Sequence, residues 1–184
     1  YVGNFETQEE KDEMVAKYGS EALRPSVKMS KSLGNVVNPD DVIKAYGADT
    51  MRLYIMFIGD FEKTAGWSDE AVKGSKRFLD RCWNLMDQAA DDYAVSAKNE
   101  SIIHKTIKKV GEDIENFSFN TSVAAFMICL NELGDCSKRE ILEPLVALIA
   151  PFAPHIAEEL WHEALGKTTT VCDAEFPVFN AEYL

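Results

Sequence analysis

The chain has 184 residues, carries a net charge of −12 and is 46% hydrophobic. That hydrophobic fraction supports a folded core and excludes disorder along the whole chain. The acidic total excludes uniform, nonspecific attraction to nucleic acid, so any RNA-binding surface has to be a local patch. The long apolar run from Ile141 to Ala157 contains Glu143 and three prolines, so we predict no membrane span. The four cysteines form no C-x-x-C pair, which favours a reducing, cytoplasmic setting over a disulfide framework.

The first candidate site follows a charged run from Glu6 to Lys17. It reads Lys28-Met29-Ser30-Lys31-Ser32 and continues with Leu33, Gly34 and Asn35; we call residues 28–35 the KMSKS loop. Two ammonium groups three positions apart, two hydroxyls and a glycine that permits a sharp turn are suited to grip a triphosphate and release pyrophosphate. A solvated surface loop is the alternative, since lysine and serine are common on surfaces.

Capping residues and hydrophobic periodicity predict helices along the rest of the chain. In chain order, these run from the cap Asn38 to Gly47, from the cap Asp49 to Phe57, from the cap Ser68 to about Asp91, over Ile103–Phe117, from a cap at Asn120 or Thr121 to Gly134, and from Pro154 to Gly166. A Ser137–Glu140 capping-box pattern precedes Pro144, which leaves either a kinked helix or one that begins at this proline. Such helices with short connections predict an antiparallel bundle, with Trp83, Phe126 and Trp161 in its core rather than stacked on bases.

One face of the helix predicted from Ser68 is a candidate binding surface. Its apolar seam consists of Val72, Ser75, Leu79, Cys82 and Met86. The opposite side, which we call the basic stripe, consists of Lys73, Arg77, Arg81 and Asn84. Three cations unrelieved by acid on one stripe are conspicuous in so acidic a chain, which makes this face a candidate for contact with an anionic partner. A solvated outer face is the alternative.

A second group of polar residues raises the question of a metal site. His155, Glu159 and His162 share a helix face, and Glu-x-x-His is the spacing of carboxylate-bridged di-iron bundles. Such a site needs a second Glu-x-x-His and two further glutamates, which the sequence lacks. We therefore predict no bound metal and a helix-stabilising surface instead.

The KMSKS loop resembles the signature loop of class I aminoacyl-tRNA synthetases, and the resemblance continues beyond it. It is carried by Asn38–Asp41, Tyr46–Tyr54, Glu70–Trp83, Phe119–Thr121 and Ala150–Trp161, and covers about Ser26 to Phe179. Residues 1–25 carry no part of it that we use. Within the branched-aliphatic subgroup, Met51–Phe57 and Gly74–Leu79 are more similar to the leucine enzymes of bacteria than to the valine or isoleucine enzymes.

This resemblance implies an all-α, mainly helical fold. An antiparallel bundle similar to the anticodon-binding domain of class I synthetases would follow the signature-loop segment of the catalytic domain. Residues 1–66 would be the C-terminal piece of the catalytic domain, and residues 67–184 the helical tRNA-binding domain. The HIGH motif that class I chemistry needs does not precede the loop, and Pro154–Ala157, which resembles it superficially, is interpreted as a helix start. We therefore expect a piece of a larger enzyme that is inactive by itself.

The resemblance also implies a reaction, in which ATP activates leucine with loss of pyrophosphate and leucine is then transferred to tRNA. Lys28 and Lys31 would be catalytic, and ATP would contact Lys28, Met29, Ser30, Lys31, Ser32 and Gly34. Mg²⁺ would arrive with ATP, and leucine would bind through regions outside this chain. The basic stripe would lie along the tRNA. Two alternatives remain open: a noncatalytic RNA-binding or scaffold module with the same helical domain, and a valine or isoleucine enzyme.

Overall fold

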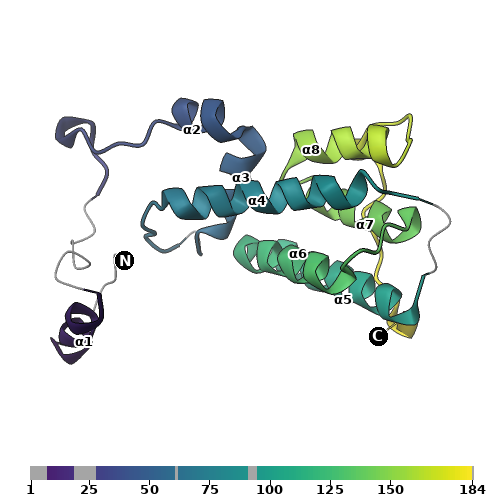
Figure 1. The fold of residues 1–184 in the computed structure, drawn as a ribbon, viewed down its shortest axis with the longest axis horizontal. Coiled ribbons are helices and arrows are strands. Elements are labelled where there is room, and N and C mark those ends of the chain that lie inside the picture. Colours follow the sequence, from purple (N-terminus) through teal and green to yellow (C-terminus); the bar gives the residue numbers. More distant parts are fainter. Residues whose placement is uncertain (1–7, 19–27, 61, 91–94, 184) are drawn as a thin grey trace. The chain divides into compact units, whose positions relative to one another are not determined.

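Helices account for most of the computed structural model, which describes residues 8–18, 28–60, 62–90 and 95–183 (Figure 1). The α-helices in these ranges are α1 (Gln8–Tyr18), α2 (Pro39–Tyr46), α3 (Ala48–Phe57), α4 (Asp69–Met86), α5 (Ala97–Glu115), α6 (Phe119–Leu133), α7 (Arg139–Ile149) and α8 (Pro154–Glu159). A π-helical turn, η3 (Leu160–Ala164), continues α8. The described residues contain no β-strand, only one isolated bridge between Ala90 and Lys138. The prediction of a mainly helical fold is confirmed.

Contacts divide the chain into two compact units. The first comprises Tyr1–Asn38 and Thr64–Trp67, and includes α1 and the KMSKS loop. The second comprises Pro39–Lys63 and Ser68–Leu184, and includes α2 to α8. By their contacts, α2 and α3 thus belong with the later helices. The boundary between a catalytic and a tRNA-binding domain at residues 66 and 67 stays a prediction.

Several helix limits follow the local signals in the sequence. Pro39 opens α2, and Gly47, which has a φ of 91°, separates α2 from α3. The Ser68 hydroxyl accepts a hydrogen bond of 3.2 Å from the Ala71 N–H, so Ser68 caps α4 as predicted. The helix α6 ends at Gly134, whose φ of 57° is favourable only for residues that tolerate the left-handed region.

Other limits differ from the predictions. The helix α4 ends at Met86, and Asp91, where we expected its end, lies outside the described residues. Asn120 and Thr121 lie in the first turn of α6 rather than before it. The predicted capping box at Ser137 is wrong, because α7 begins at Arg139 with no side-chain cap. Pro144 lies inside α7, so this helix neither starts nor ends at the proline.

The core of the second unit lies where α3 to α8 meet. Its largest fully buried side chains include Tyr54, Phe126 and Phe152, each of which contributes about 1.5–3 kcal/mol through burial. The rings of Phe126 and Phe152 meet edge to face, with centroids 5.1 Å apart. Trp161 is buried and Trp83 packs partly buried against the same core, which confirms that these aromatic residues are packing residues.

The segment after α8 is held against the bundle by a small polar network. One Glu158 carboxylate oxygen accepts the Thr170 hydroxyl (2.8 Å) and the Val171 N–H (3.0 Å), and the other pairs with His162 (3.0 Å). Further along, the Tyr183 ring stacks on His104 with centroids 4.5 Å apart. The C-terminal segment therefore packs along α8 and α5, and we call the first group of contacts the Glu158 network.

Candidate functional site

The KMSKS loop forms a tight turn stabilised by its own backbone. Residues Lys31–Leu33 form a single 3₁₀ turn, in which the Gly34 N–H donates to the Lys31 carbonyl over 3.2 Å. Gly34 has a φ of 64°, in the left-handed region where a side chain costs about 1–2 kcal/mol. Glycine therefore suits this position, and the chain can reverse there.

The Asn35 side chain closes the loop into a ring. Its amide oxygen accepts the Ser30 N–H over 2.8 Å, and its amide nitrogen donates to the Lys28 carbonyl over 3.3 Å. Asn35 was not among the predicted site residues. The sequence did contain a signal for this role of Asn35, because a short amide side chain directly after a left-handed glycine is well placed to bond nearby backbone groups. Asn35 thus holds the backbone that carries Lys28, Ser30 and Lys31.

The functional groups of this loop face solvent. Lys28, Lys31, Ser32 and Gly34 are exposed, and Met29 and Leu33 expose 41% and 64% of their surface. Neither lysine forms an ion pair with the part of the chain that the structure describes. The Ser30 and Ser32 hydroxyls lie 2.7 Å apart and share a hydrogen bond. An anion can therefore meet two ammonium groups and two hydroxyls, and no ion pair within the described residues has to break first.

The basic stripe lies on the exposed side of α4, opposite the buried seam, as predicted. Acidic residues nevertheless neutralise part of this face, because Lys73 pairs with Glu70 over 2.7 Å and Lys76 pairs with Asp80. Our description of these cations as unrelieved by acid is therefore wrong for Lys73. Arg77 is exposed and forms no ion pair with the described residues.

At its far end the stripe borders a polar hollow of about 360 Å³ between α4 and α6. The Arg81 guanidinium reaches across it and donates to the Asn131 amide oxygen over 2.7 Å. The hollow is lined by Arg81, Asn84, Leu85, Gln88, Leu130, Asn131, Gly134 and Asp135. Arg81 and Asn84 thus share one surface with amide groups that can donate and accept hydrogen bonds.

Two of the residues weighed as metal ligands from the sequence, His155 and His162, have other partners. His155 pairs with Asp49 (2.8 Å), whereas His162 pairs with Glu158 rather than Glu159. No group of three or more potential metal ligands occurs in the described ranges. The Thr170 hydroxyl and Val171 N–H lower the pKa of Glu158, while the Lys167 carbonyl and then Glu158 raise the pKa of His162.

The cysteines form no disulfide within the described residues. All four are free thiols, and Cys82, Cys129 and Cys136 are buried. Burial raises the pKa of Cys129 to about 11 and shifts that of Cys82 in the same direction. The Cys82 and Cys129 thiols therefore stay protonated near neutral pH. As for membranes, none of the described helices has the length and apolar character that a span requires.

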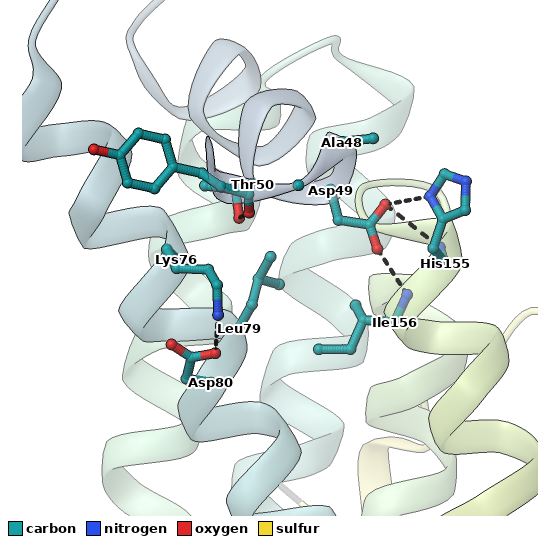
Figure 2. Close-up of a pocket in the computed structure, with 10 residues that line it drawn as sticks. Ala48, Asp49, Thr50, Lys76, Leu79, Asp80, His155 and Ile156 are labelled. Carbon is teal, nitrogen blue, oxygen red and sulfur yellow. Dashed lines mark hydrogen bonds and ion pairs between the residues drawn. The ribbon is translucent and has the colours of Figure 1, made fainter. Parts of the chain in front are cut away.

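A second cavity, of about 370 Å³, lies where the start of α3 meets α4 and α8. Figure 2 shows Asp49 pointing toward His155 and Ile156, and the Lys76–Asp80 pair on the other side. Asp49 was predicted to cap its own helix. Instead, α3 begins at Ala48, and the Asp49 carboxylate bonds to the start of α8, more than 100 positions along the chain. This contact was not predictable from local spacing.

Comparison with known proteins identifies two segments. Residues 10–68 match the family described as tRNA synthetases class I (I, L, M and V), and residues 99–184 match the anticodon-binding domain of tRNA ligase. The first match includes residues 10–25, in which sequence analysis found nothing to use. The signature loop, the connecting helices and the bundle thus define a segment of a class I aminoacyl-tRNA synthetase.

Individual relatives narrow the identification. The chain is 55% identical over 164 residues to the leucine–tRNA ligase of Parabacteroides distasonis and 53% identical to that of Phocaeicola vulgatus. It belongs to the leucine–tRNA ligase family, as its resemblance to the leucine enzymes indicated. These matches cover 85% of the chain but only 17% of each relative. The chain therefore spans about a sixth of their length.

A solved structure agrees with this assignment. The Agrobacterium radiobacter K84 agnB2 LeuRS, crystallised as a LeuRS-tRNA-LeuAMS ternary complex, matches with a TM-score of 0.73 and 31% sequence identity. The match covers 85% of this chain and 23% of that one. The helical arrangement described above is therefore that of the family.

Proposed function

We propose that the protein to which this segment belongs activates leucine with ATP, releases pyrophosphate and transfers leucine to the 3′ end of tRNA. The KMSKS loop would supply the charge that stabilises the triphosphate. The observation that carries this proposal is the loop itself, a ring closed by Asn35 that presents two exposed ammonium groups, in a chain 55% identical to a leucine–tRNA ligase.

The loop geometry suits charge that develops during the reaction. Negative charge accumulates on the β- and γ-phosphates as the bond to the α-phosphate breaks, and the mobile ammonium groups of Lys28 and Lys31 can follow it. The Ser30 and Ser32 hydroxyls now bond to each other, so each can exchange that bond for a phosphate oxygen. Gly34, already in the left-handed region, permits the loop to close over its ligand.

Magnesium enters this proposal only with the nucleotide. The described residues offer no cluster of carboxylates or histidines that would hold the ion by themselves. Mg²⁺ prefers oxygen ligands and usually keeps several waters while it binds nucleotide phosphates. ATP would therefore bring its own metal, and Lys28 and Lys31 would neutralise the phosphate charge that the metal leaves. The four free thiols support a reducing compartment such as the cytoplasm.

For tRNA, we propose that Lys73, Arg77, Arg81 and Asn84 contact the phosphate backbone. All four are exposed on one side of α4, which supports this role. Arg77 has the strongest case because no acidic residue pairs with it among the described ranges, whereas Lys73 would first leave Glu70. These contacts would position the RNA without reading its sequence.

The first experiment tests the loop in the full-length enzyme. Lys28→Ala and Lys31→Ala should each lower the rate of leucine-dependent pyrophosphate exchange about 100-fold, since losing one such contact costs about 3 kcal/mol at the barrier. The KM for ATP should change much less. Lys44→Ala, which removes an exposed lysine from α2, is the matched control.

Three outcomes would contradict the proposal. Equal losses in ATP affinity and rate would make the loop a plain binding element. Absence of leucine-dependent pyrophosphate exchange in the wild-type enzyme would favour a noncatalytic RNA-binding module. Pyrophosphate exchange that depends on valine or isoleucine would mean that one of these amino acids, and not leucine, is the substrate. The 184-residue chain alone should show no exchange above background.

The second experiment measures tRNA binding across a salt series. Each cation lost from the stripe should reduce the slope of log affinity against log salt by about 1. The variant Lys73→Ala/Arg77→Ala/Arg81→Ala is compared with Lys44→Ala/Lys98→Ala/Lys105→Ala, which removes the same charge from other exposed positions. Identical slopes for the two variants would show that the basic stripe is a solvated face with no special contact to tRNA.

A further inference from the structure

The corner between α5 and α6 contains a strained aromatic residue. Phe117 has a φ of 55°, and in the described part of the chain it is the only residue other than glycine with a positive φ. It follows Asn116, which caps the C-terminal end of α5, and the next N–H, of Ser118, donates to the Asp113 carbonyl over 2.8 Å. Glycine is the usual residue at this place in a helix end, because the left-handed region disfavours a side chain. Local backbone geometry therefore gives no reason for a phenylalanine.

Core packing gives no strong reason for Phe117 either. Its side chain is 75% exposed, and its ring meets the Phe119 ring edge to face with centroids 5.8 Å apart. Phe119 in turn meets the buried Phe152 ring at 5.9 Å. The inner two rings belong to the core, whereas Phe117 presents most of its ring to solvent. A strained residue that the core does not need is a candidate for a function.

A hollow of about 700 Å³ lies beside this ring. Its lining joins the α5–α6 corner to the segment that precedes α4, and all of it belongs to the second unit: Asp60, Glu62, Lys63, Asn116, Phe117, Ser118, Asn120 and Thr121. Asp60 accepts the Glu62 N–H over 3.1 Å and pairs with Lys63 over 3.8 Å. The Asn120 amide and the Glu62 carboxylate form no such bond with the described residues. The hollow therefore combines one apolar ring with available hydrogen-bond donors and acceptors.

This combination fits an unpaired nucleobase. A base has a flat apolar face and a polar edge, and proteins recognise single-stranded RNA by stacking bases on aromatic side chains and bonding to their edges. Amide side chains bond to the edges of bases, and carboxylates accept hydrogen bonds from amino groups. Asp60 and Glu62 therefore favour a base that carries an amino group, namely adenine, cytosine or guanine, over uracil.

The charges around the hollow favour the base over the RNA backbone. Asp60 and Glu62 repel phosphate, and Lys63 offsets only part of their charge, so a base has to enter while its phosphates stay outside. The basic stripe, which begins at Lys73 near the start of α4, can hold phosphates. A protein partner would need a larger apolar patch than one ring among polar groups. The observations thus favour RNA over a protein surface.

We propose that Phe117 stacks on an unpaired, amino-bearing base of tRNA, and that Asn120 and Glu62 bond to the edge of this base. The inference rests on the proposed tRNA binding. It goes beyond that proposal, because the basic stripe was assigned to the phosphate backbone alone. The left-handed corner keeps the ring outside the core, where a base can reach it.

The test measures tRNA binding by the full-length enzyme. Phe117→Gly should weaken this binding about tenfold, because it removes the stacking surface. It should not lower the unfolding midpoint, since glycine relieves the backbone strain. Phe117→Trp keeps an aromatic face and should bind within about twofold of wild type. Val178→Ala, which truncates another exposed apolar side chain, is the matched control.

A salt series separates stacking from charge. Loss of an uncharged ring changes no counterion release, so Phe117→Gly should bind more weakly by the same factor at every salt concentration. The charge variants of the basic stripe should instead change the slope. Unchanged affinity in Phe117→Gly, with tRNA bound by wild type, would overturn this inference and leave the proposed function intact. Wild-type enzyme that binds no tRNA would overturn both.

Chemical probing of the bound tRNA identifies the base. Dimethyl sulfate modifies unpaired adenine and cytosine, kethoxal modifies guanine, and a carbodiimide modifies uracil. One adenine, cytosine or guanine should be protected by wild type and reactive with Phe117→Gly. Protection of uracil alone, or identical protection by both enzymes, would overturn the proposal. A lower unfolding midpoint of full-length Phe117→Gly would place the ring in a protein interface and overturn it as well.

Discussion

The KMSKS loop and the contacts of Asp49 and Arg52 with the α7–α8 turn bring polar groups together in opposite ways. Hydrogen bonds in the loop join residues two to seven positions apart, whereas Asp49 and Arg52 bond to residues 99 to 107 positions away. The loop side chains are exposed, and Asp49 is buried. A local, exposed site can lose its function without unfolding the protein, whereas a site between distant segments depends on the packing around it.

The largest expected effect separates the buried core from the loop. Phe126→Ala should lower the free energy of unfolding by about 3–5 kcal/mol, because it empties a fully buried position that the Phe152 ring cannot fill. Leu33→Ala, in the exposed loop, should change it by less than about 0.5 kcal/mol. Urea unfolding of the chain measures both values. Similar losses for the two variants would show that the loop is part of the cooperative core.

The next prediction concerns Asn35. Asn35→Ala removes two local hydrogen bonds and should lower the rate of pyrophosphate exchange by the full-length enzyme about 30-fold, since each bond is worth about 1 kcal/mol. Asn35→Asp keeps an acceptor for the Ser30 N–H but cannot donate to the Lys28 carbonyl, so its loss should be intermediate. The unfolding midpoint should not move. An unchanged rate in Asn35→Ala would mean that ligand binding, and not Asn35, orders the loop.

A smaller effect is expected from pH at the Glu158 network. Its hydrogen bonds lower the pKa of Glu158 below the ordinary 4.5, so the stability from this group is present above 4.5 and lost as pH falls through the folded pKa. The pKa of His162 is raised above 6.5, so its contribution is present below 6.5 and lost as pH rises through the folded pKa. The network should therefore be most stable between about pH 4.5 and 6.5.

Thermal unfolding at several pH values tests this window. Glu158→Gln should remove the loss of stability on the acidic side, and His162→Gln should remove the loss on the alkaline side. The difference in midpoint between wild type and His162→Gln should be largest below pH 6.5. A difference that stays constant from acidic to alkaline pH would show that these side chains contribute by packing and not by charge.

The smallest effect is expected at Arg77. This side chain is exposed although it belongs to a core helix, so Arg77→Ala should change the free energy of unfolding by less than about 0.5 kcal/mol. Chemical denaturation measures the change, and Leu79→Ala, two positions away in the buried seam, provides the contrast. A large loss at Arg77 would place this residue among the structural contacts of α4 and weaken its assignment to tRNA.

Local chemistry explains which predictions were correct. Ser68 caps α4 with its own hydroxyl, and Gly134 ends α6, because the groups involved are close in sequence. Lys73 shows the limit of such reasoning. It was placed on the exposed face correctly, but its partner Glu70 lies one turn earlier, outside the stripe that we compared.

Residues whose role depends on a distant partner were assigned wrongly or missed. Aspartate is a common helix cap, and Asp49 lies where a local cap was expected. However, α3 begins one residue earlier, and the Asp49 carboxylate bonds to α8. For Pro144, the sequence left open a kinked helix or one that begins at the proline, and α7 continues through it, which excludes the second alternative. Helix packing can compensate for a local cost of this kind, and no nearby residue reveals that compensation.

The amino-acid sequence by itself determined the helical class, the order of the helices and the residues of the KMSKS loop, because these depend on side-chain periodicity, capping groups and a glycine that act within a few positions. Only the tertiary structure decided that Asp49 and Arg52 hold the α7–α8 turn, that Glu158 and not Glu159 pairs with His162, and that the C-terminal segment packs against α8 and α5. Those choices depend on which unsatisfied backbone and charged groups meet when distant helices pack, and local spacing does not contain that information.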